Sequence, residues 1–461
     1  MDLRFGLAVI AGKLTAATVR RTGRGGGTTL PGRVSVAIDG NVLPKLSRHL
    51  VEGTVLVSGT NGKTTTASLL RTLLEARYQR VAGNRAGANL VSGIAAALVA
   101  ESRGANGARV AVFEVDEASL PAVSDALLPR IVVVTNLFRD QLDRYGELES
   151  SATAIGAALA ALPASSTAIL CADDPRVASL GESLRARVLF YGLNDPSAGR
   201  EELPYAADAR FCPRCGEPFA FDRVYAGHLG SYRCPRGDFA RPELDLAAAR
   251  VQFSGLDGQR LAARGLGLDD TDLTVPLSGI YNSYNVLAAV GAARVWGLDV
   301  ADISAALRSF TPAFGRLEEV ELDGRRLRLM LAKNPASFNE VLHASIELGD
   351  ARHFLIGVND RYADGTDISW IWDVDFELLG KAESIVLSGT RALDMAIRLK
   401  YAGIDGDRVR VAEEPGPAID TATRTSPPGA EVFVLPTYTA MLELRRELTR
   451  RGHLRPYWDL R

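Results

Sequence analysis

The sequence predicts an α/β fold in which a mostly parallel sheet carries helices on both faces. Short apolar runs rich in β-branched residues alternate with helix-forming stretches along most of the 461 residues. The first clear run, Val55 to Val57, stops at a glycine turn that leads into a helix-forming stretch. A second alternation of strands and helices begins near residue 320. We therefore expect about two or three domains.

The composition is that of an ordinary soluble globular protein. Apolar residues make up 47% and charged residues 23% of the chain, and 53 basic against 55 acidic residues leave a charge of −2. No global basic field therefore favours nucleic acid as a partner. Four cysteines in this length do not make a disulfide scaffold. We expect a cytoplasmic protein that would visit the inner face of the membrane if its substrate were lipid-linked.

The first 45 residues are expected to form a helix and a glycine-rich loop. Apolar residues recur at helical spacing up to about residue 22, and the helix should end at Gly23; they are Leu3, Leu7, Ile10, Leu14 and Ala17. Lys13, Arg20 and Arg21 interrupt this segment, which is too short to span a bilayer and lacks a signal-peptide cleavage pattern. We interpret it as a surface helix. The segment 25–32 is a loop by composition, and either a mobile flap or a linker fits it.

The glycine turn after the first strand is a predicted phosphate-binding loop. It reads Gly59-Thr60-Asn61-Gly62-Lys63-Thr64, with Thr65 and Thr66 following at the helix start. Backbone N–H groups and the positive helix end would face phosphates, Lys63 adds charge, and the Thr64 hydroxyl can ligate Mg²⁺. An incidental glycine turn would not place three hydroxyl residues directly after the lysine. The sequence therefore predicts ATP binding.

Acidic and amide side chains follow the next two predicted strands. The strand 109–116 carries Glu114 and Asp116 at its end, with Glu117 next, and the strand 130–136 ends at Asn136. The carboxyl ends of parallel strands meet at one edge of the sheet, so these three carboxylates are placed to hold Mg²⁺ beside the phosphate loop, Glu114 together with Thr64. For Asp116 and Glu117 a solvated loop is the alternative. That alternative is weaker for Glu114, which lies within the apolar run.

The segment of about 205–245 interrupts the strand–helix alternation. Cys212-Pro-Arg-Cys215-Gly is followed after eighteen residues by Cys234-Pro-Arg-Gly237, a spacing typical of zinc ribbons. Glycine stands where the fourth cysteine belongs. Asp238 or His228 could supply the fourth ligand, or the site binds zinc weakly or not at all. We interpret the segment as an inserted zinc-ribbon-like element with a structural role.

A second α/β unit, 313–461, carries an unusual acidic segment. Its predicted strands are 327–332, 354–358, 385–389 and 431–436, with Lys333, Asn334 and Ser337 at the end of the first. The segment 359–377 contains five aspartates and two tryptophans: Asp360, Asp364, Asp367, Asp373, Asp375, Trp370 and Trp372. Aromatic side chains in an acidic loop suit a partner surface. The alternative is that the tryptophans pack in the core while the acids are solvated.

The short phosphate loop resembles that of the Mur ligase superfamily, whose members make amide bonds through acyl phosphates. Four further segments resemble motifs of the same superfamily. The segment 135–146 has Gln141 where histidine is usual, and Asp173-Asp174-Pro175 resembles a motif close to the nucleotide. Asn282 with Asn285 resembles the motif on the adenine side, and 312–318 resembles the linker whose arginine reaches the phosphates. By analogy Arg316 reaches the phosphates. The resemblance implies a Mur-ligase-like ATP-binding domain over 46–312, followed by a smaller Rossmann-like domain. About forty residues before the loop cannot hold the separate nucleotide-sugar domain that opens a typical Mur ligase.

The loop, the cysteine insertion and the Asp/Trp-rich segment together resemble the MurT family, the ligase subunits of lipid II isoglutaminyl synthase. The resemblance implies that ATP phosphorylates the D-glutamate α-carboxylate of the lipid II stem peptide, with Lys63 and Glu114 in the catalytic centre. Ammonia from a separate class I glutaminase subunit, GatD-like, then gives D-isoglutamine. It also implies that Asp364 completes the Cys/His triad of that glutaminase, which would dock on the C-terminal domain.

Two other functions compete with this interpretation. A Mur-type amino-acid ligase would need a site for its amine and no partner, and the short N-terminal segment counts against it. A nucleotide-switched scaffold whose ribbon binds nucleic acid is opposed by the acidic balance. The chain offers no suitable glutaminase nucleophile, because Cys171 precedes two acids that disfavour a thiolate.

Overall fold

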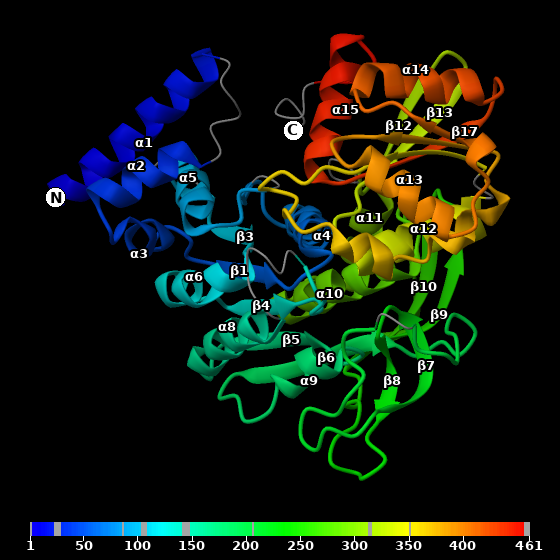
Figure 1. Ribbon diagram of the computed structural model, residues 1–461. Helices are drawn as coiled ribbons and strands as arrows, with labels where there is room; N and C mark the ends of the chain where they lie inside the picture. Colours follow the sequence, from blue (N-terminus) through cyan, green and yellow to red (C-terminus); the bar gives the residue numbers. More distant parts are fainter. Residues whose placement is uncertain are drawn as a thin grey trace.

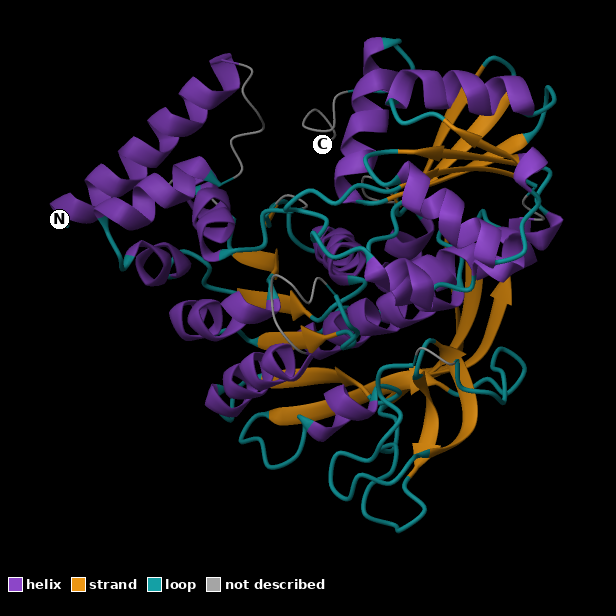
Figure 2. Ribbon diagram, in the orientation of Figure 1, coloured by secondary structure: helices purple, strands orange, loops and turns teal. Residues whose placement is uncertain are grey.

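Two sheets organise the computed structural model, which describes residues 2–22, 29–84, 87–102, 108–140, 148–204, 207–311, 316–349 and 352–455. A nine-stranded sheet forms the larger lobe, and a six-stranded sheet forms the second lobe above it in Figure 1. Helices flank both sheets, as Figure 2 shows. The predicted α/β class is confirmed.

The large sheet has the order β11-β10-β9-β6-β5-β4-β1-β3-β2. Its parallel strands are β1 (Gly53–Ser58), β2 (Val81–Ala82), β3 (Val110–Glu114), β4 (Ile131–Val134), β5 (Thr167–Cys171), β6 (Arg187–Leu193) and β9 (Leu246–Phe253). The strands β10 (Gln259–Gly265) and β11 (Leu268–Val275) extend it antiparallel. Neither these two strands nor β9 before them was predicted, because their polar outer positions weaken the strand pattern.

The helices of this lobe cover both faces of the sheet (Figure 1). On one side α4 (Lys63–Glu75), α10 (Ile280–Trp296) and α11 (Val300–Arg308) contact one another. The remaining helices are α5 (Val91–Glu101), η2 (Glu117–Ser119), α6 (Leu120–Leu127), α8 (Leu148–Ala161) and α9 (Pro175–Ser179). Fully buried side chains from β1, β3, β4 and β5 join those of α4 and α10 in one core. The phosphate loop therefore begins on a rigid base.

Three helices precede the sheet, where the sequence predicted one helix and a loop. The helix α1 (Leu3–Thr22) is confirmed, and it packs on α2 (Leu30–Ile38) and α5. The predicted loop is wrong from Leu30 on, because Pro31 occupies the first turn of α2, where its missing N–H has no cost. A third helix, α3 (Val42–Ser47), spans the expected boundary at residue 45. The predicted loop residues 25–28 lie outside the described residues.

The insertion contains a separate two-stranded sheet made of β7 (Ala220–Ala226) and β8 (Leu229–Arg233). One end of this hairpin joins the main core through Tyr225, Ala226 and Leu229. The other end carries a small cluster of its own, formed by aromatic residues and cysteines: Cys212, Phe219, Tyr232, Cys234 and Phe239. The insertion thus connects the sheet of the large lobe to the cysteine-bearing tip.

The second lobe is a six-stranded sheet of order β12-β13-β17-β14-β15-β16. Its strands are β12 (Arg316–Leu322), β13 (Arg325–Met330), β14 (His353–Gly357), β15 (Ser384–Ser388), β16 (Val409–Val411) and β17 (Glu431–Pro436). All pairs are parallel except β12 with β13. Two cores lie on its two faces, one with α12 (Pro335–Gly349) and α13 (Ala392–Tyr401), the other with α14 (Pro415–Thr425) and α15 (Tyr438–Arg450). Three short 3-10 helices complete it: η3 (Ser369–Asp373), η4 (Phe376–Lys381) and η5 (Gly406–Arg408).

None of the helices in the described part of the chain combines the length and the apolar content that crossing a membrane requires.

Asp173 and Asp174, expected near the nucleotide, are instead completely buried among protein partners. Asp173 pairs with Arg241 at 2.8 Å and accepts hydrogen bonds from the Tyr284 hydroxyl and the Leu193 N–H. Asp174 caps α9 and accepts a hydrogen bond from the Leu137 N–H. Burial raises the pKa of Asp173 despite the neighbouring Arg241 guanidinium. The two carboxylates join the insertion, α10 and the loop after β4.

We predict that Arg241→Ala lowers the free energy of unfolding by about 3–5 kcal/mol at neutral pH, because it leaves the Asp173 charge buried without its cation. The loss should shrink as the pH falls, since a buried carboxyl with a raised pKa gains its proton and becomes neutral. Urea unfolding at several pH values would measure both effects. The control is Arg233→Ala in the same insertion, whose pair with Asp222 is exposed and should contribute at most about 1 kcal/mol. Equal losses for the two variants would contradict the prediction.

Candidate active site

The phosphate loop joins β1 to α4 and leaves no room for side chains at its glycines. Gly62 has φ +85°, and a Cβ there would lie 2.0 Å from Oδ1 of Asn285. Gly59 has φ +118°, and its Cβ would lie 2.4 Å from Oγ1 of Thr135. Only glycine tolerates both the dihedral angle and the close approach. The resulting concave backbone at a helix N-terminus fits a phosphate group.

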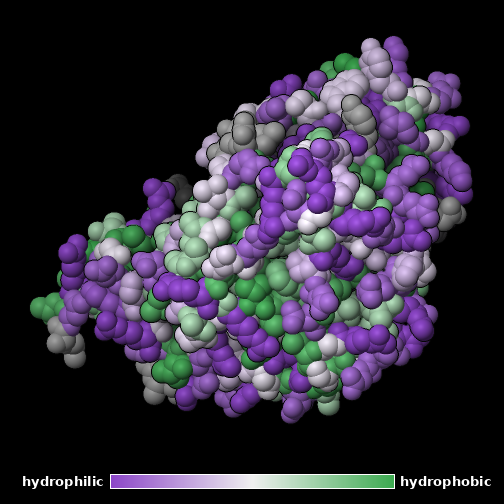
Figure 3. All heavy atoms as spheres, turned by 90° about the horizontal axis from the view of Figure 1, so that it is seen from below, coloured by the Kyte–Doolittle hydropathy of each residue, from purple (hydrophilic) through white to green (hydrophobic). Residues whose placement is uncertain are grey.

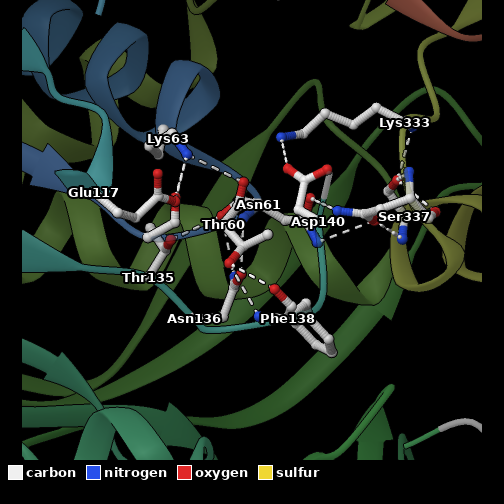
Figure 4. Close-up of polar contacts among 12 residues, drawn as sticks. Thr60, Asn61, Lys63, Glu117, Thr135, Asn136, Phe138, Asp140, Lys333 and Ser337 are labelled. Carbon is white, nitrogen blue, oxygen red and sulfur yellow. Dashed lines mark hydrogen bonds and ion pairs between the residues drawn. The ribbon is translucent and has the colours of Figure 1, made fainter. Parts of the chain in front are cut away.

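Lys63 is buried at the first position of α4 and stays charged (Figure 4). Its Nζ lies 2.9 Å from Oε1 of Glu117 and donates to the carbonyl oxygens of Gly59 and Thr60. Burial is the largest effect and acts to lower the pKa of Lys63, but the carboxylates of Glu117, Glu114 and Asp140 together outweigh it, so the pKa lies above its usual value. The sequence left two places open for Glu117, a metal site and a solvated loop, and did not predict its pairing with Lys63. The only available signal was its position three residues after Glu114.

Thr64 and Glu114, predicted to hold Mg²⁺ together, are in direct contact. The Thr64 hydroxyl donates to Oε2 of Glu114 at 2.9 Å, and Glu114 is buried at the end of β3. Asn84 fixes the Glu114 backbone by bonding both its N–H and its carbonyl oxygen. Hydroxyl and carboxylate oxygens at the mouth of a phosphate loop are ligands that suit Mg²⁺. Asp116 is used differently, because its side chain caps η2 through the Ala118 N–H.

Asn136 braces the loop from the end of the neighbouring strand. Its Oδ1 accepts from the Asn61 N–H at 2.9 Å, and its Nδ2 donates to the Asn61 carbonyl at 3.1 Å. Thr60 is held beside it, since its hydroxyl accepts from the Phe138 N–H at 3.0 Å (Figure 4). These bonds fix the path of the loop.

A cleft of about 790 Å³ opens beside the loop and is lined by both lobes. Asn61, Thr65 and Asn136 lie on one side, while Asn282 and Asn285 at the start of α10 lie on another. Nδ2 of Asn285 donates to Oδ1 of Asn282 at 2.9 Å, which confirms that the two asparagines share one face. The hairpin between β7 and β8 and the helix α12 of the second lobe complete the walls.

Glu340 on α12 is a cleft residue that the sequence did not reveal. It accepts a hydrogen bond from the Gly227 N–H at 3.1 Å, and Arg200 lies 3.9 Å away. Burial raises the pKa of Glu340. An acid on an amphipathic helix gives no sequence signal that separates it from a solvated one.

Other polar contacts close the two lobes over the loop. Nδ2 of Asn334 donates to Oδ1 of Asn61 at 3.1 Å, and Lys333 pairs with Asp140 (Figure 4). Arg139 reaches Asp373 at 3.2 Å. Lys333 and Asn334, which follow β13, thus contact the large lobe from the second lobe.

Asp364 lines a second cleft, of about 500 Å³, together with Asp140, Lys333 and Trp370. The residue is only 4% exposed. Its carboxylate accepts from the Thr439 N–H at 2.8 Å and from the Thr439 hydroxyl. Burial raises its pKa, against the effect of these hydrogen bonds. It therefore lies at the base of the Asp/Trp-rich segment and not on its outer surface.

The two tryptophans of this segment have different surroundings. Trp370 packs on Phe338 in the core of the second lobe. Trp372 is half exposed and contacts the exposed ring of Tyr401 on α13. Trp370 therefore follows the core alternative, and Trp372 is exposed, as the predicted partner surface requires.

The three cysteines of the insertion meet, since their sulfur atoms all lie within 4.8 Å of one another. Asp238 follows Cys234 closely in the chain, but its carboxylate is not among the ligand atoms that lie within 4.8 Å of one another. His228 does not join them, because it lies in the turn at the far end of the hairpin, completely buried against Phe138 and 3.3 Å from Asp174. A metal ion fits the cysteine cluster.

Two predicted sites lie partly outside the residues that the structure describes. Arg316 is the first residue of β12, opposite Met330, and the description does not extend to its side chain. Of the motif 135–146, residues 141–146 lie outside the described residues.

Solved structures with the same fold define the class of protein. The chain superposes on MurF from Acinetobacter baumannii with a TM-score of 0.65 at 16% identity, covering 91% of this chain and 80% of that one. It superposes on Mycobacterium tuberculosis folylpolyglutamate synthase complexed with ADP and AMPPCP with a TM-score of 0.60 at 18% identity, covering 90% and 96%. Residues 57–210 match the Mur ligase middle domain. The fold is that of the Mur ligases.

Sequence comparison narrows the class to one family. Residues 331–441 match the MurT ligase C-terminal domain. The subunit MurT of lipid II isoglutaminyl synthase (glutamine-hydrolyzing) from Staphylococcus aureus is 33% identical over 446 residues, which is 96% of this chain and 97% of that protein. The MurT subunit from Streptococcus pneumoniae is 31% identical over 458 residues, 99% of each. The chain belongs to the MurT family and is a ligase.

We predict that Thr64→Val lowers ATP turnover by about 10- to 100-fold, because the metal loses one oxygen ligand while Glu114 loses its donor. Thr64→Ser keeps the hydroxyl and should retain most of the turnover. ATP consumption measured over a range of Mg²⁺ concentrations would show the loss as a shift to higher Mg²⁺. Equal turnover in the valine and serine variants would remove Thr64 from the metal site.

Proposed function

We propose that this chain amidates the α-carboxylate of D-glutamate in the lipid II stem peptide to D-isoglutamine, using ATP and ammonia from a glutaminase subunit. The observation that carries the proposal is the Thr64–Glu114 pair beside the phosphate loop, in a chain that matches MurT subunits over nearly its whole length. We place the reaction in the cytoplasm, at the inner face of the membrane.

The reaction has two steps. A carboxylate oxygen of the substrate attacks the γ-phosphorus of ATP and ADP leaves, which gives an acyl phosphate. The nitrogen of ammonia then attacks the acyl carbon, phosphate leaves with the electron pair of the broken C–O bond, and the nitrogen loses a proton. Lys63 and the N–H groups at the start of α4 would spread the phosphate charge, and Thr64 and Glu114 would hold Mg²⁺. Lys63 would exchange part of its contact with Glu117 for the phosphate.

The contact between the lobes would protect the acyl phosphate. Asn334 and Lys333 reach the loop region from the second lobe, so a closed form keeps water from the reacting carbon. The walls of the larger cleft would hold the nucleotide, with Asn282 at the adenine and Asn61, Thr65 and Asn136 nearer the phosphates. We assign Arg316 to the phosphates by analogy only. In this division residues 46–312 bind the nucleotide and 313–461 receive the partner.

A separate subunit would have to supply ammonia. Burial raises the pKa of the Cys171 thiol well above its usual value, and Cys171 is completely buried in the core. The other three cysteines meet at the tip of the insertion. We therefore expect a class I glutaminase, GatD-like, to dock on the second lobe. The outer face of α13 offers exposed apolar side chains next to Trp372, which are Leu393, Ile397 and Tyr401.

We assign the acid of the glutaminase triad to Asp364. It is held rigidly by Thr439 and lines the cleft that also contains Lys333 and Asp140. A carboxylate in this place could orient a histidine of the partner on one side while ammonia moves toward the nucleotide cleft on the other. Docking would have to open access to Asp364, because the carboxylate is buried in the free chain.

We assign the cysteine cluster to a structural zinc ion, with Asp238 as the fourth ligand once its side chain turns toward the three sulfur atoms. Three thiolates and one carboxylate make a tetrahedral set that zinc accepts. His228 is excluded from the set by its distance, since the five residues of β8 lie between it and Cys234, and six residue steps of extended strand span about 20 Å. The ion would stiffen the tip of an insertion whose other end lines the nucleotide cleft.

Mass spectrometry of lipid II after incubation tests the proposed function. The chain with ATP, Mg²⁺ and ammonium should give a product one dalton lighter, roughly, since –OH is replaced by –NH₂. Glutamine should replace ammonium only when the glutaminase is present. ATP consumption with an added amino acid in place of ammonium would identify an amino-acid ligase, and no turnover in any mixture would favour a scaffold.

For Asp364→Asn we predict that glutamine-driven amidation falls by about 10⁴-fold while ammonium-driven amidation survives, because only the triad loses its acid. Thr439→Val is the matched control, since it removes a hydrogen bond of Asp364 but keeps the carboxylate. The control should retain most of both activities. Parallel loss of both activities in Asp364→Asn would make Asp364 a residue of the ligase site or of the local fold.

We predict that the purified chain carries zinc in stoichiometric amount and that Cys212→Ser releases it. Asp238→Asn should weaken zinc binding by about tenfold or more, because a neutral amide is a poorer ligand than a carboxylate. Asp222→Asn changes an exposed acid of the same insertion and should have no effect. Elemental analysis measures the zinc content, and competition with a chelator measures the zinc affinity. Equal affinity in the Asp238 and Asp222 variants would exclude Asp238 as a ligand.

A further inference from the structure

The helix α1 exposes a row of large apolar side chains that no described residue covers. Leu3, Leu7, Ile10 and Leu14 are between 57% and 79% exposed. The opposite side of the helix packs on α2 and α5, with Ala8 completely buried. In Figure 1 the helix lies along the outer edge of the large lobe, and Figure 3 shows apolar side chains at the left edge of the surface, where the N-terminal helices lie.

The charges on α1 are arranged around this row. At about 100° per residue, Arg4 and Lys13 lie roughly a quarter turn from the centre of the row, on opposite sides of it. Both are exposed, although they also bond the carbonyl oxygens of Ile38 and Ser102. Arg21, also exposed, continues the row at the C-terminal end. No acidic residue occurs from Leu3 to Thr22.

We infer that α1 is a membrane-surface helix, which inserts its apolar row into the headgroup region of an anionic lipid leaflet. An apolar row flanked on both sides by basic side chains is the arrangement of a helix lying in the plane of such a surface. The long arms of Arg4 and Lys13 can reach the phosphates while the row enters the apolar layer.

Pairing of α1 with a second copy of the chain fits the observations less well. The 4-3-4 spacing of the row matches a coiled-coil seam, but it covers only about two heptads, fewer than the three or four that a coiled coil sustains. Two such helices would also bring their basic flanks together with no acidic residue to pair with them. Lipid headgroups supply the missing negative charge.

The inference rests on the residues of α1, and the lipid-linked substrate proposed above would give the binding a use. The membrane-helix inference predicts that the full chain associates with vesicles that contain no lipid II at all. Its failure is therefore distinguishable from a failure of the proposed amidation, which is measured on detergent-solubilised substrate.

The experiment is sedimentation of the full chain with vesicles of phosphatidylglycerol and phosphatidylcholine in equal parts, and with phosphatidylcholine alone. The wild type should bind the anionic vesicles, and less so at high salt. The double variant Leu7→Gln with Leu14→Gln should bind at least about tenfold more weakly, because two apolar side chains no longer leave water. Both positions are exposed, so the fold and the ammonium-driven activity in detergent should be unchanged.

The matched control is Leu393→Gln with Ile397→Gln, which removes two similarly exposed apolar side chains from α13. It should bind vesicles as the wild type does. Equal loss in both double variants, or no association of the wild type with anionic vesicles, would overturn the inference. Sedimentation velocity without lipid tests whether α1 instead pairs with a second copy of the chain. If the wild type forms a dimer that the α1 variant abolishes, and does not bind vesicles, the row belongs to that dimer.

Discussion

The close approach of the phosphate-loop backbone to its neighbours constrains the rest of the active site. Gly59 lies against Thr135 and Gly62 against Asn285, so strand β4 and helix α10 must come within van der Waals distance of the loop. Asn136 then bonds both backbone groups of Asn61. Side chains from three separate parts of the chain thus shape one anion site, and a shift in any of them would change its geometry.

Charge within this site is balanced before any nucleotide binds. The Glu117 carboxylate holds Lys63 in its charged form, and the Thr64 hydroxyl is directed at Glu114. The buried carboxylates that the site does not use are paired elsewhere, as Asp173 is with Arg241. Because unpaired buried charges are costly, this arrangement explains why so many acids cluster near the loop without destabilising it.

The second lobe and the insertion both contribute to the nucleotide cleft. Glu340 on α12 bonds the Gly227 N–H at the hairpin turn, while Asn334 bonds Asn61 in the loop. The cysteine tip, the cleft and the second lobe are therefore connected through short, ordered elements. Such a layout would let docking on the second lobe influence closure over the nucleotide.

Local patterns in the sequence were enough to determine the strand–loop–helix of the phosphate site, the strand that ends at Glu114, the strand that Asn136 follows, the asparagine pair on α10 and the three cysteines. Each depends on spacing along one segment, and spacing is visible in a sequence. The tertiary structure decided the rest: the partner of Lys63, the burial of Asp173, Asp174 and Asp364, the exclusion of His228 from the cysteine cluster, and the exposure of the apolar row on α1. These features depend on which surfaces meet when distant segments pack, and periodicity alone cannot distinguish a covered apolar face from an open one.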